Sequence, residues 1–266
     1  MRNPVSCSVL NFVNKYFSDG ELADITTYYI PIIRDAGFDG IEVFLRTPRQ
    51  QDIRRIKRTI IRYGVPVTSV HFPEGLFDEP KSYCLKRVKE LVDASLAIDC
   101  DLGIIYPPWV DTKGAAEEKL KALLYDLLPW TEARDFRLSI ETAHIDDCSN
   151  YFKKVINEFG QELIYLSLDM SFLAAAGFTV GKFCEETDIL PDNIYVNDYT
   201  SRQEDDNGHL KSPALGKGNI DFVEAGFSLK HLGYEGIFTL KTPLSHLTDP
   251  ILELVRCQNL IFNTLV

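Results

Sequence analysis

The sequence lacks the features of several protein classes. Its six cysteines are far apart and form no CxxC pair, a spacing that indicates neither a zinc knuckle nor a disulfide scaffold and fits a reducing cytoplasm. It has no run of about 18 uninterrupted apolar residues, and its first residues do not combine a charged segment, an apolar run and a small-residue cleavage site. We therefore expect an unprocessed cytoplasmic protein without a membrane partner.

Basic residues are also scarce. The chain has 28 lysines and arginines against 39 aspartates and glutamates, a net charge of −11, which repels phosphate backbones and disfavours nucleic acid as a partner. The remaining composition, 45% hydrophobic and 25% charged, is that of a globular protein with a sizeable core. A length of 266 residues fits either two domains or one α/β barrel of roughly 250 residues.

Short apolar, β-branched runs alternate with amphipathic segments along the chain. The runs are Val5–Leu10, Gly40–Leu45, Val67–Phe72, Leu102–Tyr106, Arg137–Glu141, Ile164–Asp169, Asn193–Asp198 and Gly236–Lys241. The segments with helical spacing are Asp24–Ala36, Arg49–Tyr63, Lys81–Ile98, Ala115–Glu132, Asn150–Phe159, Phe172–Glu186, Asp221–Leu232 and Asp249–Phe262. Four of these segments are followed by a glycine suited to a left-handed cap: Gly37, Gly64, Gly160 and Gly233.

Eight strand and helix units in series predict a parallel sheet closed into a barrel. The alternative is an open sheet with a small appended domain, but no linker or change in composition marks a boundary. We therefore predict a single-domain (β/α)8 TIM barrel over residues 1–266.

Polar residues stand where the predicted strands end, which is where the chemistry of such barrels is found. They are Glu42, Arg46, His71, Tyr106, Glu141, His144, Asp169, Tyr195, Asn197, Asp198 and Lys241. A buried carboxylate costs several kcal/mol unless it is paired, hydrogen-bonded or metal-bound. Carboxylates and a lysine in these places predict one convergent polar site.

Six segments, in the right order and spread over nearly the whole chain, resemble those of the xylose-isomerase-like barrels, a group that includes sugar isomerases and epimerases and endonuclease IV. The segments are Gly37–Glu42, Ser69–Pro73, Ile140–Thr142, Leu168–Asp169, Val196–Asp198 and Leu215–Phe222. Epimerases of this group hold one divalent metal with Glu, Asp, His and Glu after strands five to eight. The resemblance aligns Glu141 and Asp169 with the first two ligands, but Tyr195 and Lys241 with the last two.

Lys241 decides how this site is interpreted. A charged lysine cannot ligate a dication, so one interpretation places its ammonium where the family has its metal, between Glu141 and Asp169. A second makes Lys241 an amine of lowered pKa that forms a Schiff base or acts as a base. A third is a structural ion-pair cluster. The remaining alternative is a metal site with altered ligands, in which Glu141 and Asp169 hold Mn²⁺, Mg²⁺, Co²⁺ or Zn²⁺.

The resemblance implies an isomerase or epimerase that acts on a small sugar, sugar phosphate or related ketone by proton transfer next to a carbonyl. Glu141 would be the acid/base and Lys241 would polarise the substrate oxygen. Residues expected to bind the substrate are Glu42, Arg46, His71, Tyr106, Asp169, Tyr195, Asn197 and His209. The competing interpretation is a catalytically silent barrel that binds a small molecule or another protein, and the sequence does not decide between a monomer and a homo-oligomer.

Two further features suggest places for a phosphate or a sugar ring. Arg46 and Arg49 follow the second strand and have guanidinium groups suited to a phosphate or carboxylate, and the glycines of Gly216–Gly218 are suited to cradling a phosphate before a helix. The aromatic residues expected to wall the site are Phe72, Tyr106, Trp109 and Phe172.

Overall fold

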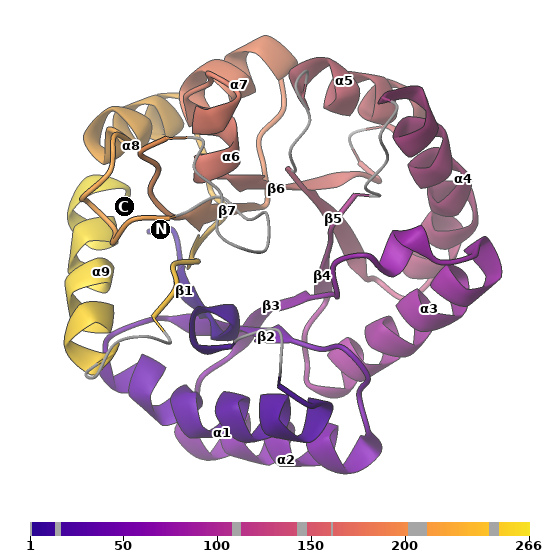
Figure 1. Ribbon diagram of the computed structural model, residues 1–266, viewed down its shortest axis with the longest axis horizontal. Helices are drawn as coiled ribbons and strands as arrows, with labels where there is room; N and C mark the ends of the chain where they lie inside the picture. The colour runs from indigo at the N-terminus through magenta and orange to yellow at the C-terminus, as the bar shows by residue number, and fades with distance from the viewer. Residues whose placement is uncertain are drawn as a thin grey trace.

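The computed structural model describes residues 2–13, 17–107, 113–142, 148–160, 162–201, 212–244 and 250–266. Its strands form a closed parallel barrel in which each strand pairs with the next in the chain and β8 returns to pair with β1. Helices form a ring around this barrel (Figure 1). The predicted TIM barrel is therefore confirmed, while the assignment of residues 1–266 as one domain stays a prediction.

The elements follow one another in the order expected. The strands are β1 (Val5–Ser8), β2 (Gly40–Phe44), β3 (Val67–His71), β4 (Leu102–Ile105), β5 (Arg137–Glu141), β6 (Tyr165–Asp169), β7 (Asn193–Val196) and β8 (Ile237–Leu240). The helices are α1 (Asp19–Asp35), α2 (Gln50–Tyr63), α3 (Lys81–Ala97), α4 (Lys113–Glu132), α5 (Cys148–Phe159), α6 (Met170–Ala175), α7 (Val180–Thr187), α8 (Phe222–His231) and α9 (Pro250–Thr264), with 3-10 turns η1 (Val9–Phe12) and η2 (Leu76–Asp78). Within the described ranges, no helix has the length and apolar character that crossing a bilayer requires.

The end of β1 and the start of α1 both differ from the predicted boundaries. The strand expected over Val5–Leu10 ends at Ser8, whose hydroxyl accepts a hydrogen bond from the Leu10 amide and starts η1. Helix α1 begins five residues earlier than expected, because Ser18 and Glu21 form a capping box. Both differences come from local hydrogen bonds that apolar periodicity does not register.

A single helix expected over Phe172–Glu186 is wrong, because the structure has two helices there. Gly177, with a φ of +83°, breaks the segment after α6, and the Thr179 hydroxyl then caps α7. Helix α6 contacts β6 and β7 and lies inside the ring of helices (Figure 1). The glycines expected to end helices all have positive φ: Gly37, Gly64, Gly160 and Gly233.

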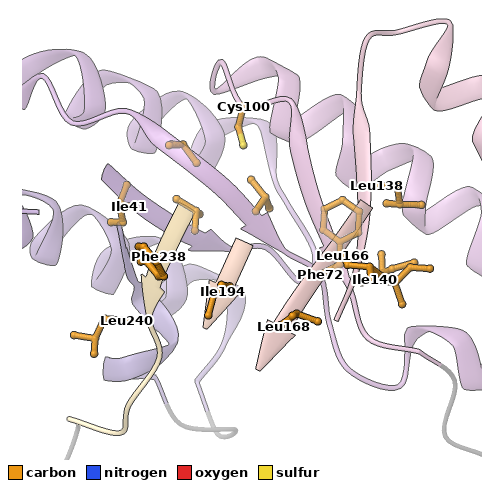
Figure 2. Packing of buried hydrophobic residues seen from close by; sticks show 14 of the residues in the cluster. Ile41, Phe72, Cys100, Leu138, Ile140, Leu166, Leu168, Ile194, Phe238 and Leu240 are labelled. Carbon is orange, nitrogen blue, oxygen red and sulfur yellow. The ribbon is translucent and has the colours of Figure 1, made fainter. Parts of the chain in front are cut away.

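Strand residues alternate between two environments, as the period of a β-strand requires. One set packs with helix residues in the hydrophobic core and includes Ile140, Leu168 and Phe238 (Figure 2). The other set contains buried hydroxyls, among them Ser139 and Ser167, whose oxygens are 2.8 Å apart. Barrel interiors are usually filled by branched aliphatic side chains, so hydrogen bonds replace much of that packing in this protein.

The approach of α8 to α9 gives a test of the fold. A Cβ on Gly226 would lie 1.9 Å from the Thr264 carbonyl oxygen, so we expect Gly226→Ala to lower the free energy of unfolding by about 1–3 kcal/mol. A Cβ on Gly20 would meet only the end of the Arg49 side chain. The control Gly20→Ala should stay within about 0.5 kcal/mol of the parent. Urea unfolding of both variants measures the difference, and equal midpoints would contradict the packing described.

Candidate functional site

Glu141 is the centre of a polar cluster at the carboxyl end of the barrel. It is the last residue of β5 and has no exposed surface. Its Oε2 lies 2.8 Å from Nε2 of His71, the last residue of β3, and its Oε1 accepts a hydrogen bond from the Lys241 ammonium just after β8. Each carboxylate oxygen therefore has a partner from a different strand, which offsets the cost of burying a charge.

Asp169, the last residue of β6, completes the surroundings of Lys241. Its Oδ2 lies 3.7 Å from the Lys241 ammonium nitrogen. Asn197 donates to both carboxylate oxygens at 2.9 Å. Oδ1 also accepts from the Ser171 amide at 3.0 Å and from the Phe172 amide at 3.2 Å, so that Asp169 is the N-cap of α6. One carboxylate thus serves both the cluster and the start of a helix.

The charges in the cluster shift one another's pKa values. Burial raises the pKa of Glu141, but Lys241 and His71 together outweigh it and the pKa falls below its ordinary value. Burial also raises the pKa of Asp169, which Lys241 only partly counteracts, and that pKa is raised. For His71, burial lowers the pKa, but the hydrogen bond and charge of Glu141 outweigh it and the pKa is raised. Glu141 is therefore ionised at neutral pH.

Lys241 is an ammonium in this site. Burial lowers its pKa, but the charges of Glu141 and Asp169 exceed that effect and leave the pKa raised above its ordinary value. The interpretation of Lys241 as an amine of lowered pKa is therefore wrong, because two carboxylates face the nitrogen. Schiff-base formation needs the neutral amine, which this environment disfavours.

A second layer of polar residues lies deeper in the barrel than Glu141 and His71. Its members stand about two residues earlier on their strands, as Ser69 does relative to His71. The Tyr195 hydroxyl donates to Oε2 of Glu42 at 2.7 Å, and the Lys241 nitrogen lies 4.2 Å from the centre of the Tyr195 ring. Ser8 and Ser69 donate to Glu42 at 2.6 and 2.9 Å. Glu42 and Tyr195 are fully buried. The pair supports the cluster from inside the barrel.

The expected convergence of strand-end residues is confirmed for Glu141, Asp169, Tyr195 and Lys241, which contact one another as described. Tyr106 belongs to the same region, because the charges of Glu141 and Asp169 add to burial in raising its pKa. The roles assigned to these residues stay predictions. His144, His209 and Trp109 lie outside the described residues.

Arg46 contacts another part of the molecule. Its Nε donates to Asp19 at 2.8 Å and its Nη2 to the Phe17 carbonyl at 2.7 Å, so the guanidinium binds the start of α1. No contact joins it to Glu141 or Asp169 among the residues that the structure describes. Its expected role as a substrate ligand stays a prediction that these contacts do not support.

The expectation that Gly216–Gly218 cradles a phosphate is corrected by Asp198. The amides of Gly216 and Gly218 donate to Oδ2 of Asp198 at 2.9 and 2.7 Å. A Cβ on Gly218 would lie 2.1 Å from Oδ1 of Asp198, which explains why glycine is needed there. The anion bound by this loop is therefore an aspartate of the chain itself.

Phe72 was expected in the wall of the site, but it is a buried residue of the hydrophobic core.

Sequence reasoning missed the hydroxyl groups that position Asp169 and Glu42, through the backbone amide of Asp169 and through the carboxylates of both residues. The Thr142 hydroxyl accepts from the Asp169 amide at 2.7 Å, and the Ser171 hydroxyl donates to Oδ1 of Asp169 at 2.6 Å. Ser8 and Ser69 do the same for Glu42. For Ser8 and Ser69 the signal in the sequence is a serine within an apolar strand, which does not identify the partner.

The residues that the resemblance aligns with the family's metal ligands have other partners in this protein. The Lys241 ammonium contacts Glu141 and faces Asp169, so a cation already lies between the two aligned carboxylates. The Tyr195 oxygen, aligned with the third ligand, is hydrogen-bonded to Glu42 instead. Across the described ranges, no group of three or more His, Cys, Asp or Glu side chains is arranged to hold a metal. These donors do not fit the four-ligand site.

Removal of the Lys241 charge tests the electrostatics of the cluster. We expect Lys241→Met to lower the free energy of unfolding at pH 7 by about 2–4 kcal/mol, somewhat less than for a fully buried pair because one-fifth of the lysine side chain is exposed. The pKa of Glu141 is lowered from an ordinary value of 4.5, so its stabilising effect is present above that value and is lost as the pH falls. The difference between variant and parent should therefore shrink in acid.

Unfolding curves between neutral and acid pH check this expectation, with Lys241→Arg as the control that keeps the charge. The double variant Lys241→Met, Glu141→Gln should recover part of the lost stability, because it removes the unpaired carboxylate. A loss that is independent of pH would contradict the assignment.

The sequence profile of the xylose isomerase-like TIM barrel family matches residues 30–257, whereas no curated protein matches the chain. An L-ribulose 3-epimerase structure has a TM-score of 0.76 at 15% identity and covers 99% of this chain and 95% of that one. A D-psicose 3-epimerase from Clostridium cellulolyticum H10, solved with D-tagatose, has a TM-score of 0.75 at 13% identity, covering 98% and 99%.

A xylose isomerase-like TIM barrel protein from Mycobacterium smegmatis, solved in complex with magnesium, has a TM-score of 0.70 at 14% identity and covers 100% of this chain and 98% of that one. At such identities these structures show a shared fold. Because the family profile covers most of the sequence, the chain belongs to the xylose isomerase-like TIM barrel family.

Proposed function

We propose that this protein is an isomerase or epimerase of small sugars or related ketones that moves a proton next to a carbonyl, without the family's full metal site. The observation that carries the proposal is the placement of Glu141, a fully buried carboxylate between His71 and Lys241 at the carboxyl end of the barrel. Active sites of TIM barrels lie at this end. The sugar epimerases among structures of the same fold support the choice of substrate class.

Glu141 acts as the base and Lys241 as the electrophile in this mechanism. The carboxylate takes the proton from the carbon next to the carbonyl, the C–H electron pair forms a C=C bond, and the carbonyl π electrons move to the oxygen. The Lys241 ammonium donates a hydrogen bond to that oxygen and stabilises the enediolate. The isomerisation is completed when the proton returns to the former carbonyl carbon and the hydroxyl proton of the adjacent carbon moves to the former carbonyl oxygen, so that the C=O bond forms on the adjacent carbon.

Substrate binding itself raises the basicity of Glu141. In the free protein the hydrogen bond from Lys241 contributes to the low pKa of Glu141, which makes the carboxylate a weak base. When the ammonium turns to the substrate oxygen, Glu141 loses part of that stabilisation. Epimerisation also needs a proton donor on the opposite face of the carbon, and Asp169, whose Oδ2 lies 3.7 Å from the Lys241 nitrogen, is the candidate for that role.

The base is tested with Glu141→Gln. An amide cannot accept the proton, so we expect the exchange of the hydrogen next to the carbonyl with solvent deuterium to fall by about 10²–10⁴-fold. The rate is measured by proton NMR on a panel of ketoses and aldoses. Glu132→Gln, an exposed change on α4, is the control and should leave the rate unchanged. A folded Glu141→Gln variant with the parent rate would overturn the assignment of the base.

The metal-free mechanism is tested by removing and adding divalent ions. Dialysis against EDTA should change neither the melting temperature nor the exchange rate of the parent protein, because the Lys241 ammonium supplies the positive charge. Lys241→Glu places a third carboxylate beside Glu141 and Asp169, so manganese should stabilise this variant more than the parent, by about 2.7 kcal/mol at 100 times Kd. A parent enzyme that loses activity with EDTA and regains it with manganese would falsify the proposal for Lys241.

A further inference from the structure

The groups that the sequence offered for an anionic ligand are bound to acceptors within the chain. Arg46 donates to Asp19 and to a backbone carbonyl. Arg49 donates to Oδ2 of Asp52 at 2.6 Å, and the Asp52 side chain is only one-tenth exposed. If Arg46 turned to a phosphate, Asp19 would lose this ion pair, and if Arg49 turned, Asp52 would keep only its contact with Arg55 at 3.4 Å. A phosphate would therefore replace an existing ion pair, which reduces the gain from binding it.

The glycine-rich loop before α8 holds an anion of its own. Four backbone amides converge on the Asp198 carboxylate: Tyr199 and Ile220 at 2.8 and 3.3 Å on Oδ1, and Gly216 and Gly218 at 2.9 and 2.7 Å on Oδ2. Asp198 has no exposed surface. A cradle of this type binds phosphate in other proteins, but in this protein the aspartate occupies it.

The charge of Lys241, the cation of the polar cluster, is also neutralised by carboxylates of the chain. Lys241 faces two carboxylates, Glu141 and Asp169, and a third, Glu42, lies one layer deeper. The raised pKa of Tyr106 reflects burial first and then the negative charges of Glu141, Glu74 and Asp169. The net charge of −11 acts in the same direction. Among the described residues of this cluster, the carboxylates of Glu141, Asp169 and Glu42 therefore outnumber the Lys241 ammonium.

We infer that this site takes an uncharged sugar or polyol and discriminates against the phosphate ester of the same sugar. The inference rests on the proposed function and narrows its substrate class. Hydroxyl groups suit the donors and acceptors of Lys241, Asp169 and Asn197, and the edge-to-face rings of Tyr106 and Phe172, 6.3 Å apart, offer an apolar wall for a sugar ring. A phosphate dianion would add charge where carboxylates already predominate.

Matched pairs of ligands test this inference on the full-length parent protein. Isothermal titration calorimetry compares D-fructose with D-fructose 6-phosphate and D-ribulose with D-ribulose 5-phosphate, and the exchange of the hydrogen next to the carbonyl is measured for the same four compounds. We expect one or both uncharged sugars to bind and exchange, with the ester at least about tenfold weaker. Inorganic phosphate should not compete, and added sodium chloride should leave the affinity of the uncharged sugar unchanged.

The outcomes separate the two proposals. If a phosphate ester binds more tightly than its sugar, or inorganic phosphate competes, the inference is overturned while the proposed sugar chemistry stands. If none of the four compounds binds or exchanges hydrogen and the protein is folded, both proposals are contradicted. Binding of an uncharged sugar without any exchange supports the ligand class and contradicts the isomerase or epimerase activity.

Discussion

Glu141 imposes the main constraint on this structure, because its carboxylate has no exposed surface and must be compensated by groups of the chain. His71, at the end of β3, and Lys241, just after β8, supply the hydrogen bonds to this carboxylate. Lys241 in turn faces Asp169, which Asn197 and the first turn of α6 hold in place. The ends of β3, β5, β6 and β8 are thereby tied together through charge. The site therefore exists only where the closed barrel brings these four strand ends together.

Much of the architecture was predictable because it depends on local sequence. Each apolar run supplies a strand, and seven of the eight amphipathic segments supply one helix each. A polar residue at the end of a run marks the edge where parallel strands expose their last side chains. Glu141 and Asp169 could be placed together for that reason, and the family resemblance drew attention to Lys241 by aligning it with the last metal ligand. The break at Gly177 was not recognised, because one glycine inside an otherwise periodic segment is often tolerated.

The partners of Arg46 and of Asp198 could not be predicted, since they are distant in sequence. Arg46 binds Asp19, 27 positions earlier, and Asp198 receives the Gly218 amide from 20 positions later. A charged residue at a strand end looks the same in the sequence whether a ligand or another side chain neutralises it. Only the tertiary structure separates a group that is available to a ligand from one that stabilises a loop.

Asp169 connects the chemistry of the cluster to the backbone of α6. The carboxylate that faces Lys241 also accepts hydrogen bonds from the Ser171 and Phe172 amides, so a change in its charge alters the strength of both bonds. Amide hydrogen exchange at these two positions therefore reports the ionisation of Asp169 without a label or a substrate. A ligand that draws Asp169 away from α6 would loosen the first turn of that helix, whereas one that binds only Glu141 would leave its exchange protection intact.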